Sequence, residues 1–251
     1  MTEINRRLAF STGKYPTFGR GAYSELNPPR TVTDSPYYWW FKFLQLNEEY
    51  SKAVKKSRGS PMANLVRDFG DVSNTDFKTW WRQHSHLFAE SPNEYQMTVA
   101  NRREDLAPFN NPEVINLVVP LTWTSVGLKR RFAEIISRYD SVKTTARGLR
   151  IHESSARYRL GRRWNIEGFR NAYKIYVERQ RAVLESETTG RKLPWADIAI
   201  RAKIPAALGF KEGDTSRTNV DQRQVLTVIS LRHYKNALKF IQDSASDRFP
   251  I

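Results

Sequence analysis

The stretch SPYYWWFKFLQL at residues 35–46 decides the fold, because it places six aromatic side chains in one short segment. Ser35 can cap a helix, and Pro36 suits the first helical turn because proline has no N–H to leave unpaired. Apolar side chains cover more than one face of the helix predicted to continue to Lys56, so we expect it at the centre of a core. The whole chain has 7 Trp, 11 Tyr and 13 Phe, a composition that argues against disorder.

The residues around this stretch predict further helices. Ser60 and Pro61 repeat the start signal for a short helix, and residues 73–76 resemble a capping box before an amphipathic helix over 77–88. We therefore predict an extended arm over 1–34, with several Gly and Pro, and an aromatic-rich helical domain over 35–107. Buried core is the favoured interpretation of its paired tryptophans, over a stacking platform for bases.

Residues 108–251 are predicted to form a second, basic α+β domain. β-branched residues over 114–121 predict an edge strand, and the alternation over 149–160 predicts a hairpin. Helices are predicted from Ser125, over 165–187, around 195–208 and over 220–244. The predicted fold class is α+β and predominantly α-helical, with a short antiparallel sheet in the basic region.

Positive charge is concentrated in the second half of the chain. Residues 1–125 contain 15 Lys and Arg against 13 Asp and Glu, whereas residues 126–251 contain 26 against 13. The densest segment, 129–181, has 15 basic and 5 acidic residues. A surplus confined to half of a folded chain indicates a polyanionic partner, most often nucleic acid.

The candidate nucleic-acid contacts are the cations of this segment that three predicted elements can present together. On the helix over 165–187, Arg170, Lys174 and Arg181 lie within about 40° at 100° per residue. A solvated helix face is the alternative, but Glu167 and Glu178 are too few to neutralise the set. The full candidate set is Lys129, Arg130, Arg131, Arg150, Arg157, Arg159, Arg162, Arg163, Arg170, Lys174 and Arg181.

Motifs for other functions are incomplete. Residues 195–204 match the first helix of a helix-turn-helix, but Pro205 and Gly209 break its second helix, which favours an ordinary short helix. His84 and His86 point about 200° apart on a helix, so they cannot share a metal. No phosphate-binding loop, dinucleotide fingerprint or nucleophile elbow is present. We expect no catalytic residue, metal or cofactor; a nuclease built from scattered carboxylates is the third hypothesis.

Four segments resemble conserved-hypothetical proteins of bacterial prophages and integrative islands. They are residues 37–47, the short runs 69–72 and 76–81, and the ending from His233 to Pro250. The resemblance implies a mobile genetic element in a bacterial cytoplasm. It carries over no functional residue, because no activity is established for that group.

These observations predict a non-catalytic DNA-binding protein, a regulator or accessory factor with duplex DNA favoured as partner. Its near-neutral half would make homo-oligomer or protein contacts. The alternative is a structural or assembly protein, capsid-associated or scaffolding. The chain has no Cys, which excludes a disulfide framework and fits a cytoplasmic location. No apolar run approaches the ~20 residues of a membrane span, so no membrane partner is expected.

Overall fold

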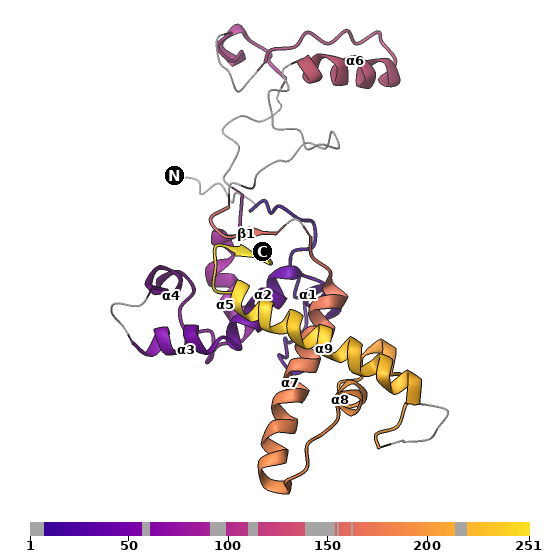
Figure 1. Cartoon of the computed structure of the whole chain (residues 1–251). Helices are drawn as coiled ribbons and strands as arrows, with labels where there is room; N and C mark the ends of the chain where they lie inside the picture. Colours follow the sequence, from indigo (N-terminus) through magenta and orange to yellow (C-terminus); the bar gives the residue numbers. More distant parts are fainter. Residues whose placement is uncertain are drawn as a thin grey trace. The chain divides into compact units, whose positions relative to one another are not determined.

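The chain forms two compact units in the computed structural model, which describes residues 8–56, 61–90, 99–109, 115–138, 154, 156–161, 163–213 and 220–251. Unit 1 contains residues 1–90 and 155–251, and unit 2 contains residues 91–154. Unit 1 therefore includes residues on both sides of the expected boundary near residue 107. The described part is predominantly helical, as predicted (Figure 1).

The N-terminal part of unit 1 is a series of short helices. They are α1 (Arg30–Thr33), α2 (Pro36–Gln45), α3 (Glu48–Lys55), α4 (Ala63–Phe69) and α5 (Phe77–His84), followed by the 3-10 turn η1 (Ser85–Leu87). The single helix predicted from Ser35 to Lys56 is divided because Asn47 leaves the helical conformation and its side chain accepts the Tyr50 N–H at 2.9 Å. Asp76 caps α5 in the same way, accepting the Thr79 N–H at 3.0 Å.

The C-terminal part of unit 1 consists of two long helices with a short one beside them. These are α7 (Ile166–Thr189), α8 (Trp195–Arg201) and α9 (Val220–Asp243), which pack on one another (Figure 1). Asn165 caps α7 by accepting the Glu167 N–H at 2.9 Å. Gly190 ends the helix with φ at 66°, a conformation that glycine adopts without steric cost. α7, α8 and α9 confirm that helices form in these three segments, as the sequence predicts.

The predicted antiparallel sheet is wrong. β1 (Arg159–Leu160) pairs in parallel with β2 (Arg248–Phe249), with Arg159 opposite Arg248 and Leu160 opposite Phe249. The alternation of residues identified an extended segment, but its partner lies far along the chain, where a local pattern gives no information. The N-terminal half of the predicted hairpin, residues 149–153, lies outside the described residues.

The predicted edge strand over 114–121 is also wrong for its described residues. Residues 115–120 form no strand, and Val118 and Leu121 are 99% and 93% exposed. A β-branched run becomes a strand only when a partner strand and a packing surface are available. In this stretch Asn116 instead forms two hydrogen bonds with Ala107, donating to its carbonyl at 2.8 Å and accepting its N–H at 3.2 Å.

The main core of unit 1 is aromatic and combines residues from both ends of the chain. Trp40 is fully buried, packs against Phe88 and Phe249 with ring centroids 5.2 and 5.4 Å away, and donates its indole N–H to the Ser244 carbonyl at 2.8 Å. Tyr158 lies in the same core, and its backbone N–H donates to the Leu87 carbonyl at 3.1 Å. The paired tryptophans are thus core residues, as favoured from the sequence.

A second core joins α7, α8 and α9. Ile175, Ile198 and Leu226 are among its buried residues. A nearly buried ion pair lies beside it, with Arg223 Nη2 2.8 Å from Asp197 Oδ1, which also accepts the Gly213 N–H at 3.1 Å. The pair and the apolar contacts fix α8 against α9.

Unit 2 contains the 3-10 turn η2 (Arg103–Asp105) and the amphipathic helix α6 (Ser125–Arg138). The helix was expected here with Ser125 as its cap, but Ser125 is its first residue and Thr124 Oγ1 accepts the Gly127 N–H at 3.3 Å. None of the unit 2 residues that the structure describes is buried. The apolar stripe of α6 remains partly or fully exposed, with Phe132 at 41%.

Candidate nucleic-acid interface

Three predicted contact residues lie on α6 in unit 2, where all are exposed. Arg131 is ion-paired with Glu134 at 2.8 Å, and Arg130 is paired more loosely at 3.9 Å. The hydrogen bond from Arg131 lowers the pKa of Glu134 below its ordinary value. Lys129 makes no ion pair with a described residue. One carboxylate thus offsets part of the positive charge of this helix.

Three other predicted contact residues, in unit 1, have acidic partners. Arg157 is paired with the buried carboxylate of Asp68, Arg170 with Asp34 at 3.2 Å, and Arg181 with Glu178 at 2.6 Å. Arg157 and Arg170 join segments that are distant in sequence, and so they have structural roles. Their charges are largely offset within the protein, which makes them weaker candidates for phosphate contact. Arg150 and Arg162 lie outside the described residues.

The remaining predicted cations, Arg159, Arg163 and Lys174, make no ion pair with any described residue. Arg159 and Arg163 are exposed, whereas Lys174 is half-buried on α7. The Arg159 guanidinium Nε donates to the Ala156 carbonyl at 3.1 Å. Arg159 and Arg163 are thus the two predicted residues with exposed, unpaired charge near the sheet.

The structure brings these two arginines together with cations from the end of the chain. Arg248 lies opposite Arg159 in the β1–β2 register. Arg163 lines the same pocket as Pro250, and Lys239 Nζ donates to the Ile251 carbonyl at 2.9 Å. We call Arg159, Arg163, Lys239 and Arg248 the terminal cationic cluster, because Arg248 belongs to residues 248–251 and the other three lie beside this segment.

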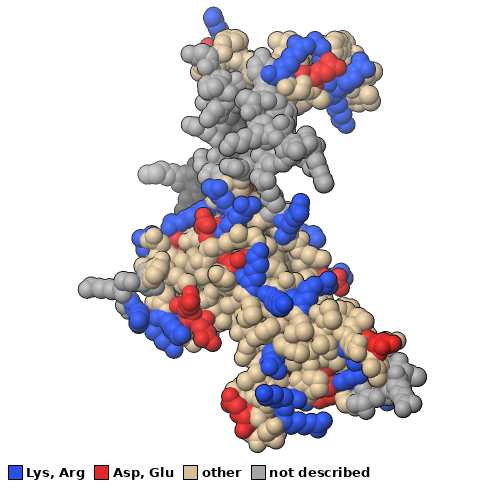
Figure 2. Space-filling view, viewed as in Figure 1, with Lys and Arg blue, Asp and Glu red and all other residues tan. Residues whose placement is uncertain are grey.

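Helix α9 extends this cluster along its exposed face. Arg232, Lys235 and Lys239 are all exposed and make no ion pair with a described residue. At about 100° per residue they fall within a 60° arc, because they are spaced three and four residues apart. In the face shown in Figure 2, Lys and Arg side chains gather over the two-stranded sheet and the C-terminal half of α9.

Acidic groups near the cluster are few. Asp243 is buried, and its carboxylate accepts the Ile251 N–H at 3.0 Å. Asp247 is exposed, and its main-chain carbonyl accepts the Arg159 N–H at 2.8 Å. Among the described ion pairs none joins either carboxylate to a cation of the cluster. Within the described ranges the cluster is therefore a positively charged surface, with the exposed Asp247 at its edge.

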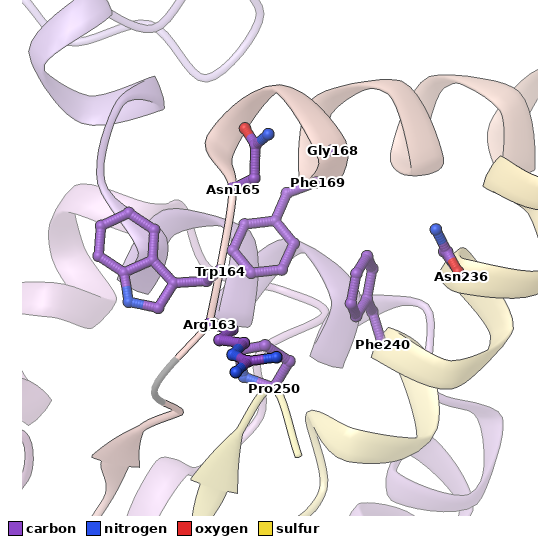
Figure 3. Close-up of a pocket in the computed structure, with 8 residues that line it drawn as sticks. All are labelled: Arg163, Trp164, Asn165, Gly168, Phe169, Asn236, Phe240 and Pro250. Carbon is purple, nitrogen blue, oxygen red and sulfur yellow. The ribbon is translucent and has the colours of Figure 1, made fainter. Parts of the chain in front are cut away.

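An open pocket of about 700 Å³ lies beside the cluster, between the start of α7 and α9 (Figure 3). Its lining residues are Arg163, Trp164, Asn165, Gly168, Phe169, Asn236, Phe240 and Pro250. The Phe169 and Phe240 rings meet edge to face with centroids 4.9 Å apart. Lys14 Nζ lies 5.9 Å from the centroid of the Trp164 ring. The pocket thus combines aromatic walls, two amides and an arginine.

The helix-turn-helix candidate has only its first helix. α8 packs through Ala199, which is fully buried, and Lys203 occupies the turn with φ at 49°, where glycine is usual. The 3-10 turn η3 (Pro205–Ala207) follows in place of a recognition helix. α8 is an ordinary packed helix, as favoured from the sequence.

Sequence reasoning missed Arg232, Lys235, Lys239 and Arg248. The first three carried a signal, namely basic residues three and four apart on a helix with acids only at Asp221 and Asp243. Arg248 carried no local signal, because its place opposite Arg159 depends on the fold.

Two further features were sought among the described residues, a metal site and a membrane-spanning helix. These residues contain no group of three or more His, Asp or Glu side chains arranged to hold a metal ion. Within the same ranges, no helix has the length and apolar character needed to cross a membrane.

Comparison with known proteins gives no relative. No protein-family model, curated protein or solved structure matches the chain.

Proposed function

We propose that this protein binds nucleic acid without catalysing its cleavage, as a DNA-binding regulator or accessory factor of a mobile genetic element. The observation that carries the proposal is the terminal cationic cluster, in which exposed cations from distant segments converge without ion pairs to any Asp or Glu that the structure describes. Uncompensated like charges repel one another, so a fold that gathers them favours an anionic ligand.

Duplex DNA is the preferred form in this proposal. Phosphates repeat along both strands, and an arginine guanidinium donates two parallel hydrogen bonds to phosphate oxygens. The cluster and the α9 residues Arg232 and Lys235 supply the phosphate contacts in unit 1. Lys129, Arg130 and Arg131 on α6 supply a second basic surface in unit 2.

Binding is tested by fluorescence anisotropy with labelled random duplex DNA, single-stranded DNA and RNA at two salt concentrations, without divalent metal. The cluster variant is Arg159→Gln/Lys239→Gln/Arg248→Gln. It should bind every duplex more weakly, and its salt slope should fall by about 0.9 for each lost phosphate contact.

The matched control is Arg191→Gln/Lys192→Gln/Lys211→Gln, which removes the same charge from exposed residues remote from the sheet. The control should retain most of the affinity. Equal losses in the two variants would show that net charge matters and the cluster does not. No binding by the wild-type protein at low salt would overturn the proposal.

A second candidate function, a structural or assembly protein, is favoured by one observation. Val126 and Phe132 on α6, with Trp123 just before it, are 76%, 41% and 50% exposed, which gives unit 2 an uncovered apolar surface. A large oligomer in light scattering that persists at high salt would support this function over DNA binding.

A further inference from the structure

The pocket beside the terminal cationic cluster has walls suited to a flat aromatic ligand. Trp164 and Phe240 are half-buried, so part of each residue stays accessible, and the buried Phe169 lies between them in the view of Figure 3. Gly168 leaves space at this point of α7, because it has no side chain. The volume of about 700 Å³ is sufficient for a nucleobase with its sugar.

Two amide residues line the same pocket, Asn165 just before α7 and Asn236 on α9. Asn165 Oδ1 accepts the Glu167 N–H at 2.9 Å, and its Nδ2 makes no hydrogen bond with a described residue. The Asn236 amide, on α9, also makes no hydrogen bond with them. An amide both donates and accepts, which matches the alternating donors and acceptors on the edge of a base.

The charge around the pocket fits the backbone of a nucleic acid. Arg163 belongs to the lining, and Lys239 lies three residues beyond Asn236, on the neighbouring face of α9. None of the described lining residues is acidic. A base in the pocket would therefore have its flanking phosphates beside cations.

We propose that this pocket receives one unpaired nucleobase of the nucleic acid held by the terminal cationic cluster. The aromatic rings contact the face of the base, Asn165 and Asn236 bond to its edge, and Arg163 binds an adjacent phosphate. The proposal rests on the proposed function and adds to it a second mode of binding, in which the protein prefers single strands that carry bases to single strands that lack them.

The test compares two labelled single strands of equal charge, a thymidine 12-mer and a 12-mer of abasic residues. Both have the same phosphates, so binding through phosphates alone gives equal affinities. The wild-type protein should bind the thymidine strand about ten-fold more tightly, which is the size of effect that stacking one base produces. Equal affinities would overturn the base pocket while leaving the proposed function intact. Failure to bind either strand or duplex DNA at low salt would overturn both.

Two variants test whether the preference for the thymidine strand over the abasic strand arises at this pocket. Gly168→Phe fills the pocket, whereas the control Gly168→Ala adds a Cβ whose nearest neighbour, Asn165 Cβ, is 3.7 Å away. Asn236→Leu removes one amide from an exposed helical position. Gly168→Phe and Asn236→Leu should bring the ratio of the affinities for the thymidine and abasic strands towards one, without changing the affinity for the abasic strand. Gly168→Ala should keep the wild-type ratio. If both pocket variants fold, by their urea midpoints, and keep the full ratio, the base does not bind here.

Discussion

Arg159 and Arg248 lie opposite each other in the parallel β1–β2 pair, on the exposed face of the sheet, with no acidic partner among the described residues. Their neighbours Leu160 and Phe249 point towards the core instead, and Phe249 is fully buried. The apolar residues thus fix the register that places two positive charges side by side. Like charges in this position are unfavourable until an anion binds between them.

Removing one of these charges should therefore affect stability and binding in opposite directions. Arg248→Gln should increase the free energy of unfolding by about 0.5 kcal/mol, because the repulsion from Arg159 disappears. The same variant should bind duplex DNA more weakly, with a salt slope lower by about 0.9. Urea unfolding and anisotropy measure the two effects. A loss of both stability and affinity would indicate that Arg248 has a structural role instead.

Gly161 is required where β1 and β2 approach each other closely. Its N–H donates to the Phe249 carbonyl at 2.8 Å, and a Cβ at this position would lie 2.0 Å from the Pro250 carbonyl oxygen. Gly161→Ala should separate the strands, lower the urea midpoint and weaken DNA binding by displacing Arg159 from Arg248. Gly168→Ala is the control and should be neutral or stabilising, since it sits within α7 without a clash. Equal midpoints for the two variants would contradict this close contact.

Breaking the Asp197–Arg223 pair should be costly. Their side chains are 5% and 14% exposed, so Asp197→Ala leaves a guanidinium with little water and without its carboxylate. We expect a loss of about 3 kcal/mol in urea unfolding. Asp197→Ala/Arg223→Met should recover part of it, because the unpaired charge is also removed. The pair Lys52–Glu48, with side chains 73% and 83% exposed, is the comparison, and Lys52→Ala should cost no more than about 1 kcal/mol.

The buried tyrosines should make the folded protein less stable at high pH. Burial raises the pKa of Tyr37 to about 12, from 10.0, and it also raises the pKa values of Tyr38, Tyr50 and Tyr158. The unfolded chain releases these protons near pH 10 and the folded chain only at higher pH. The free energy of unfolding should therefore be constant up to about pH 9 and fall from pH 10 upward.

Urea midpoints at pH 7, 9, 10 and 11 measure this effect. Tyr158→Phe removes one such proton, together with the hydrogen bond from its hydroxyl to Asp68 at 2.6 Å. The variant should be less stable than the wild type at pH 7, and its free energy of unfolding should fall less between pH 9 and pH 11. Tyr15→Phe, at a residue 45% exposed, is the control and should behave as wild type. An unchanged wild-type midpoint between pH 9 and 11 would contradict the prediction.

The helices were predictable because their signals are local. Ser35, Asp76 and Asn165 each precede the helix that the sequence predicts, and the side chains of Asp76 and Asn165 accept backbone N–H groups of the first turn. Asp76 itself is the cap of α5, although the predicted capping box over residues 73–76 would place the cap at Ser73. The sheet was not predictable in the same way. The parallel pairing of Arg159 with Arg248 joins residues from distant segments, and residues 115–120 carry a strand pattern without a partner.

The candidate site was predictable only in part, because the partners of its cations come from distant segments of the chain. Of the predicted contacts, Arg159 and Arg163 lie beside the sheet and make no ion pair with a residue that the structure describes. Arg157 and Arg170 are paired with Asp68 and Asp34, carboxylates that only the fold brings near them. Counting acids close in sequence therefore underestimates how much positive charge is neutralised.

The hydrogen bond between the Tyr158 N–H and the Leu87 carbonyl, at 3.1 Å, has a consequence for how the gene can change. Because these two residues are neighbours, the chain leaves unit 1 and returns to it at one point, with residues 91–154 inserted between. Doubling the length of a flexible insertion adds only about 0.6 kcal/mol of closure entropy. Recombination can therefore lengthen, shorten or exchange this module at little cost to the aromatic core, so unit 1 can persist as a constant scaffold while the inserted module diverges.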